Sequence, residues 1–138
     1  MEKMRVPLPN AHWSNFTYES MWVERVSSER YRIRNIPFFV ENLAPDDLVE
    51  VKDDDGGLVF VSVVEASENS VFVCMCQDQL TATEFLGELK ELGLRYEVGF
   101  DKEIFAVACD KPRLSNVRKF LRRLEKSGKL EYGELTVR

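Results

Sequence analysis

Two segments in the second half of the chain are apolar at every position. Residues 71–76 read Val-Phe-Val-Cys-Met-Cys, and residues 104–109 read Ile-Phe-Ala-Val-Ala-Cys. A β-strand with one face in water alternates apolar and polar residues, whereas a strand buried on both faces does not. The two segments therefore predict central strands of a sheet that is covered on both faces.

Each of these strands is followed by a pattern typical of an amphipathic helix. Residues 81–92 carry apolar side chains at helical spacing, and Thr81 with Glu84 predicts a capping box at the helix start. A second apolar repeat follows Asp110, which can cap a helix, and it ends before Gly128. We therefore expect two helices of about three turns each.

Alternating segments after each helix, residues 94–100 and 130–137, predict two edge strands. The resulting order is strand–helix–strand–strand–helix–strand, the split βαβ order of ferredoxin-like sandwiches, whose first and third strands are central. Composition and topology agree, because the two wholly apolar segments fall on those two strands. We expect these central strands to be parallel neighbours.

Short β-rich segments separated by turn residues fill the first half of the chain, at residues 21–26, 31–34, 48–52 and 58–65. Between the last two, Asp55-Gly56 predicts a hairpin turn with positive φ angles. Several short strands in about 50 residues favour a small bent sheet or partial barrel. Residues 1–19 are expected to be irregular, because Pro7 and Pro9 interrupt regular structure.

The predicted fold class is α+β. A small bent β-sheet or partial barrel, residues 20–69, packs on a ferredoxin-like βαββαβ unit, residues 70–138. Both helices cover one face of the second sheet, so its other face needs a different cover. We expect the first unit to supply it and the two units to share one core, because the first unit is small. A second copy of the chain, in a homodimer, is the alternative.

The charge of the 138-residue chain is unevenly placed. The net charge is −5, and residues 1–70 carry 7 basic and 13 acidic side chains. Between positions 41 and 68 the sequence has nine acidic residues and a single basic residue, Lys52. The acids are Glu41, Asp46, Asp47, Glu50, Asp53, Asp54, Asp55, Glu65 and Glu68. An acidic surface attracts basic partners and repels nucleic acid. The alternative interpretation is a solvated face that keeps a small β-rich unit soluble.

The residues that could do chemistry form no catalytic signature. His12 is the single histidine, so neither a histidine metal pair nor a triad with a second histidine can form. No phosphate-binding loop, dinucleotide fingerprint or nucleophile elbow is present. Tyr18, Glu19 and Glu24 could act as acids or bases, but no spacing supports that role. We expect no enzyme activity and no cofactor.

Three cysteines are the remaining candidates for a reactive site. Cys74 and Cys76 lie two apart on a strand and so share a face. If the central strands are parallel, Cys109 ends beside Cys76, and the three thiols converge on a soft-metal or redox site. The alternative is that each is a small buried apolar residue. An odd number of cysteines, no apolar leader and no long apolar run together predict a reduced, cytoplasmic, non-membrane protein.

Four segments in the first half of the chain carry a family resemblance: the strand at 21–26 (Met-Trp-Val-Glu-Arg-Val), the step Asn35-Ile36-Pro37-Phe38, the Asp55-Gly56 hairpin and the Val63-Val64-Glu65 strand. Together they resemble a bacterial family known only as a domain of unknown function. The resemblance covers roughly residues 20–75. Members carry Gly-Asp before the strand that starts at Leu48, where this chain has Asp46. The resemblance implies a fold, not an activity.

Taken together, these patterns predict a non-enzymatic protein-binding protein. Its most concrete form is a bacterial immunity protein that neutralises a basic toxin or nuclease domain through the acids from Glu41 to Asp55. No nucleic acid is expected as a partner. The alternative function is a small-molecule sensor or regulatory ferredoxin-like module with a pocket lined by Trp22, Phe38 and Phe39.

Overall fold

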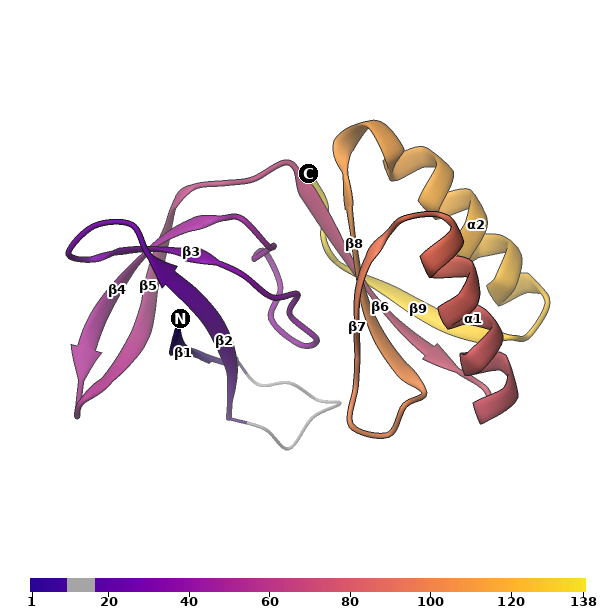
Figure 1. Cartoon of the computed structure of the whole chain (residues 1–138), viewed down its shortest axis with the longest axis horizontal. Helices are drawn as coiled ribbons and strands as arrows, with labels where there is room; N and C mark the ends of the chain where they lie inside the picture. Colours follow the sequence, from indigo (N-terminus) through magenta and orange to yellow (C-terminus); the bar gives the residue numbers. More distant parts are fainter. Residues whose placement is uncertain (10–16) are drawn as a thin grey trace. The chain divides into compact units, whose positions relative to one another are not determined.

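The computed structural model describes residues 1–9 and 17–138, and the chain divides into two compact units, residues 1–67 and 68–138 (Figure 1). The fold class is α+β, as predicted: a closed five-stranded barrel is followed by a four-stranded antiparallel sheet with two helices. That the two units share one core stays a prediction.

The barrel strands are β1 (Glu2–Pro7), β2 (Tyr18–Arg25), β3 (Arg30–Ile33), β4 (Leu48–Asp54) and β5 (Gly57–Glu65). Successive strands pair antiparallel, and β1 closes the ring by pairing parallel to β5 at Leu58 and Val59. Alternate residues point inward, since a strand has a period of two. The buried residues of this barrel core are Met4, Val6, Met21, Val23, Tyr31, Ile33, Val40, Leu43, Val49 and Val51.

The prediction that residues 1–19 are irregular is wrong for residues 2–7, which form β1. Met4 and Val6 are buried and alternate with exposed Lys3 and Arg5, which is a strand pattern. The pattern is short, and the strand ends at Pro7, because a proline has no N–H to donate to a ladder. His12 lies outside the described residues.

The hairpin between β4 and β5 is as predicted. Asp55 and Gly56 have φ angles of 51° and 76°, which is the positive-φ pair of a tight hairpin turn. The ladder contains two register shifts, which leave Val61 and Val64 as the extra residues of two β-bulges.

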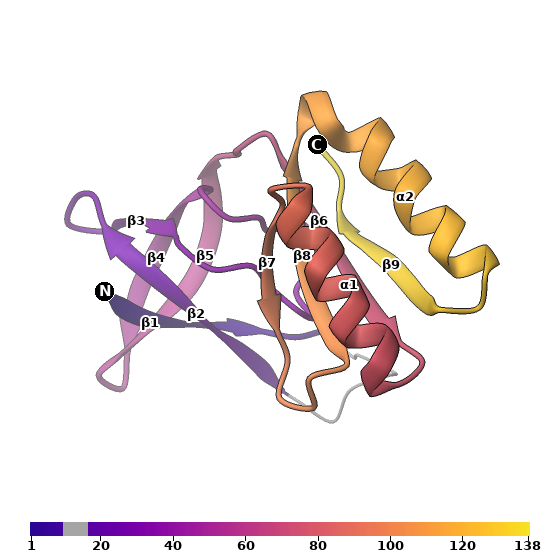
Figure 2. The same cartoon turned by 45° about the vertical axis from the view of Figure 1, so that its right-hand side comes forward.

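The second unit contains β6 (Asn69–Cys76), α1 (Gln79–Glu91), β7 (Arg95–Val98), β8 (Ile104–Asp110), the 3₁₀ turn η1 (Lys111–Arg113), α2 (Leu114–Lys126) and β9 (Leu130–Thr136). The strand order β7-β8-β6-β9 confirms that the two apolar strands are central. Both helices lie on one face of this sheet (Figures 1 and 2). Their core contains edge-on Phe85–Phe105 and stacked Phe85–Phe120 ring pairs.

Two sequence predictions about this unit are wrong. The N-cap of α1 is Asp78, three residues before Thr81, where the capping box was predicted, and its carboxylate accepts a hydrogen bond of 2.8 Å from Thr81 N–H. The central strands are antiparallel, not parallel, with Ser70 opposite Cys109. The helical crossover returns the chain to β7 in the direction of β6, so the hairpin partner β8 must run the opposite way.

No helix within residues 1–9 and 17–138 is long and apolar enough to span a membrane.

Candidate functional site

The predicted acidic surface divides into interior and exposed carboxylates. Asp47 is fully buried, and its oxygens accept hydrogen bonds from Ala44 N–H at 3.0 Å and Ser67 N–H at 2.7 Å. Asp47 therefore leaves the set of partner-binding candidates, because its carboxylate fastens two chain segments inside the barrel unit.

Asp46 is half-buried and also has a local structural role. Its φ angle is 73°, the left-handed conformation that glycine adopts most easily, at the position where the resemblance expects glycine. Its carboxylate lies 3.2 Å from the Arg34 guanidinium. The pKa of Arg34 is raised, first by its hydrogen bond to Glu24 and also by the charges of Glu24 and Asp46.

The other predicted acids lie at the barrel surface. Asp53, Asp54 and Asp55 are exposed at the tip of the β4–β5 hairpin, and Glu41 is exposed before β4. Glu50 is half-buried, with its carboxylate 3.5 Å from the Ser62 hydroxyl. The hairpin tip thus presents three adjacent carboxylates to solvent.

Strand β5 carries exposed apolar side chains on the same hairpin, near Ser62, which lies opposite Glu50. The exposed fractions of Val61, Val63 and Val64 are 47%, 36% and 40%. Glu65, at the end of the strand, is also exposed. The sequence predicted β5 as a strand but not this exposed surface. The sequence did hold a signal for the surface, because the run of apolar residues in β5 is too long for the one face that points into a small barrel.

The aromatic residues proposed as pocket walls do not share one environment. The Trp22 side chain is 44% exposed on β2, with the Lys3 ammonium 5.0 Å from its ring. Phe38 and Phe39 are half-buried in the loop between β3 and β4, with ring centroids 6.5 Å apart. A ligand pocket lined by all three residues stays a prediction.

That loop is held by Glu19 of β2. One carboxylate oxygen accepts a 2.7 Å hydrogen bond from Phe38 N–H, and the other accepts 3.0 Å bonds from Phe39 and Val40 N–H. Val40 then enters the barrel core. Glu19 therefore acts here as a structural anchor for backbone donors, a role that its sequence position did not indicate.

The three cysteines do not converge, so the soft-metal or redox alternative is wrong, and all three side chains are buried. Because β6 and β8 are antiparallel, Cys109 lies opposite Ser70, at the other end of the strands from Cys76. Burial raises the pKa of all three thiols, that of Cys76 to about 11. Within the described part of the chain, no three His, Cys, Asp or Glu side chains are grouped as metal ligands.

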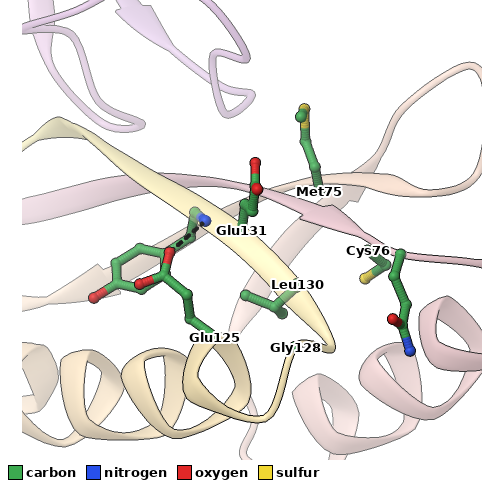
Figure 3. A pocket seen from close by; sticks show the side chains of 8 residues that line it. Met75, Cys76, Glu125, Gly128, Leu130 and Glu131 are labelled. Carbon is green, nitrogen blue, oxygen red and sulfur yellow. Dashed lines mark hydrogen bonds between the residues drawn. The ribbon is translucent and has the colours of Figure 1, made fainter.

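A shallow pocket of about 580 Å³ lies at the end of the second sheet (Figure 3). It is formed by the end of β6, the end of α2 and the start of β9. Its lining residues are Met75, Cys76, Gln77, Glu125, Gly128, Leu130, Glu131 and Tyr132. Glu125 lies between α2 and β9, whereas Glu131 points to the opposite side of β9 (Figure 3), and burial raises the pKa of the Cys76 thiol to about 11. A small cationic molecule fits this chemistry.

Helix α2 carries a basic surface. A hollow of about 430 Å³ on its outer side is lined by Lys119, Arg122, Arg123, Lys126 and Ser127. Arg118 instead pairs with Glu134 through two hydrogen bonds of 2.8 and 2.9 Å. The second unit thus has its own cationic face, distinct from the acidic hairpin of the barrel.

The fold and these surfaces define a small α+β protein with a five-stranded barrel and a ferredoxin-like sandwich. Within that class, the model of the family described as domain of unknown function DUF4265 matches residues 19–132. The chain belongs to this family, which confirms the resemblance read from residues 20–75 and extends it into the second unit.

A solved structure shows the same fold. It is the crystal structure of a hypothetical protein from Neisseria gonorrhoeae, which is 24% identical and superposes with a TM-score of 0.83 over 99% of this chain and 96% of that one. No curated protein matches the chain.

Proposed function

We propose that this protein is a non-enzymatic binding protein that takes a basic protein partner on the barrel surface formed by β4 and β5. The observation that carries the proposal is the combination, on one hairpin, of exposed valines with exposed carboxylates. Exposed apolar side chains bordered by charge are typical of protein interfaces. The concrete form is a bacterial immunity protein that covers a basic toxin domain.

The charges favour this partner class. Residues 1–67 carry 7 basic and 12 acidic side chains, a net charge of −5. Charges closer than the Debye length of about 8 Å act together on an approaching partner at physiological salt. Adjacent Asp53, Asp54 and Asp55 satisfy that condition and attract a surface that has itself evolved to hold phosphate.

The test is the association of the purified chain with the toxin domain encoded beside its gene. Neutralising the hairpin with Asp53→Asn, Asp54→Asn and Asp55→Asn should slow association by about tenfold and weaken its salt dependence. The matched control changes three acids in the second unit, Glu84→Gln, Glu88→Gln and Glu91→Gln, and should change the rate far less. Absence of a complex, together with absence of protection of cells expressing the toxin, would overturn the proposal.

A second candidate function follows from the pocket between β6, α2 and β9. Its volume falls in the range of ligand sites, and the carboxylate of Glu125 in its lining favours a small organic cation. In a thermal-shift screen, an amine that binds the pocket should raise the unfolding temperature of the chain, and Glu125→Gln should reduce that rise. A screen in which no amine moves the unfolding temperature of the unaltered chain would refute this candidate.

A further inference from the structure

Within residues 1–9 and 17–138, the outer edge of β5 has a strand partner over only part of its length. On one side β5 pairs with β4 from Gly57 to Glu65, but on the other side β1 pairs with it at Leu58 and Val59 alone, among residues 1–9 and 17–138. Beyond Phe60 the described strands leave the outward N–H and C=O groups of β5 without a ladder partner. Such groups are a template for another strand.

This edge lacks the usual chemical protection. Natural edge strands are guarded by lysine, by proline or by an inward-pointing charge. Residues 61–64 read Val-Ser-Val-Val and contain none of these, and the three valines are 36–47% exposed. The bulges at Val61 and Val64 twist the strand, which limits the length of an added strand to a few residues but does not close the edge.

The charges around the edge select its occupant. Glu50 lies opposite Ser62 on β4, and Glu65 ends the strand. A second copy of the chain would bring two sets of these carboxylates together, and such like-charge contacts are unfavourable. A segment that carries lysine or arginine brings opposite charge instead.

We propose that the edge of β5 from Phe60 to Glu65 adds one strand from a basic partner, an extended segment that alternates Lys or Arg with apolar residues. Its backbone continues the sheet, its apolar side chains cover the valines, and its cations reach the carboxylates. This inference rests on the proposed function and specifies how the partner is held.

The experiment uses the full chain and two labelled ten-residue peptides of equal charge, one alternating lysine with valine and one alternating lysine with proline. Proline cannot donate to a ladder, so the valine peptide should bind at least about tenfold more tightly by fluorescence anisotropy. Binding should also slow amide exchange between Val61 and Glu65. Equal binding of the two peptides, or binding by neither, would overturn the edge proposal.

Two double variants separate the edge from net charge. Val63→Lys with Val64→Lys places lysines on the edge, and should weaken binding of the valine peptide by about tenfold. The control, Val26→Lys with Val137→Lys, adds the same charge at exposed valines outside β5 and should bind nearly as well as the unaltered chain.

The two proposals fail in different ways. Suppose that the toxin domain binds, that the hairpin Asp→Asn variant binds it more weakly, and that the edge variant binds the valine peptide as tightly as its control does. The protein-binding function then stands and the edge proposal falls. If the free chain dimerises in light scattering and the edge variant is monomeric, a second copy occupies the edge, which also overturns the proposal.

Discussion

Glu19 offers the sharpest test of how the barrel is held together. Its carboxylate accepts three backbone hydrogen bonds, from Phe38, Phe39 and Val40, at 2.7 to 3.0 Å. In Glu19→Gln the amide oxygen can still accept two of them, but the NH₂ group faces the third N–H, donor against donor. Loss of one charge-assisted bond and weakening of two others should lower the free energy of unfolding by about 2 kcal/mol.

Glu19→Ala removes both carboxylate oxygens and should cost about 3 kcal/mol, because Phe38 and Phe39 are half-buried and water can replace part of the lost bonding, whereas Val40 is buried. Urea unfolding followed by tryptophan fluorescence measures these values. Trp22 lies on β2, so its fluorescence reports the unfolding of the barrel unit.

Glu24→Gln on the same strand is the matched control. The Glu24 side chain is 55% exposed and pairs with Arg34 at 3.0 Å, so the change should cost less than about 0.5 kcal/mol. If Glu19→Gln costs no more than Glu24→Gln, the three hydrogen bonds do not stabilise the barrel and the reasoning is refuted.

Three further predictions concern single side chains. The fully buried Tyr31 hydroxyl has no hydrogen-bond partner within the described residues, so Tyr31→Phe should stabilise the barrel by about 1 kcal/mol in urea unfolding; a loss of stability would contradict this. Asp46→Gly should be about 1 kcal/mol more stable than Asp46→Ala, because φ is 73°; equal stability of the two variants would contradict the strain. The folded pKa of Cys76 is raised to about 11 from 9.0, so the folded state holds this proton longer than the unfolded state, and stability should fall between pH 9 and 11. Thermal unfolding should show a smaller fall for Cys76→Ala, and an identical fall in both proteins would refute the assignment.

Local patterns in the sequence determined the order of elements and much of the fold. Two unbroken apolar runs identified the central strands and Asp55-Gly56 identified the hairpin, whereas Asp110 caps the 3₁₀ turn η1 that precedes α2 and not α2 itself. Each signal depends on side-chain period or on the φ preference of a few adjacent residues. Such signals are present in the linear chain before it folds.

The sequence could predict less of the candidate site. The acids at the hairpin tip were visible as a charge cluster, but Asp47 and Asp46 belonged to the same cluster and proved to have structural roles. Composition cannot separate a carboxylate that faces water from one that faces a backbone N–H. That distinction depends on which distant segment returns to meet it.

Tertiary structure alone decided the features on which the proposed function rests. The bonds of Glu19 reach up to 21 residues along the chain, and those of Asp47 reach 20. The antiparallel central strands set Cys109 apart from Cys76, and among the described residues β1 pairs with β5 at two positions alone. Strand direction, register and unpaired backbone groups arise only when residues far apart in sequence meet, and a pattern of adjacent residues does not contain that information.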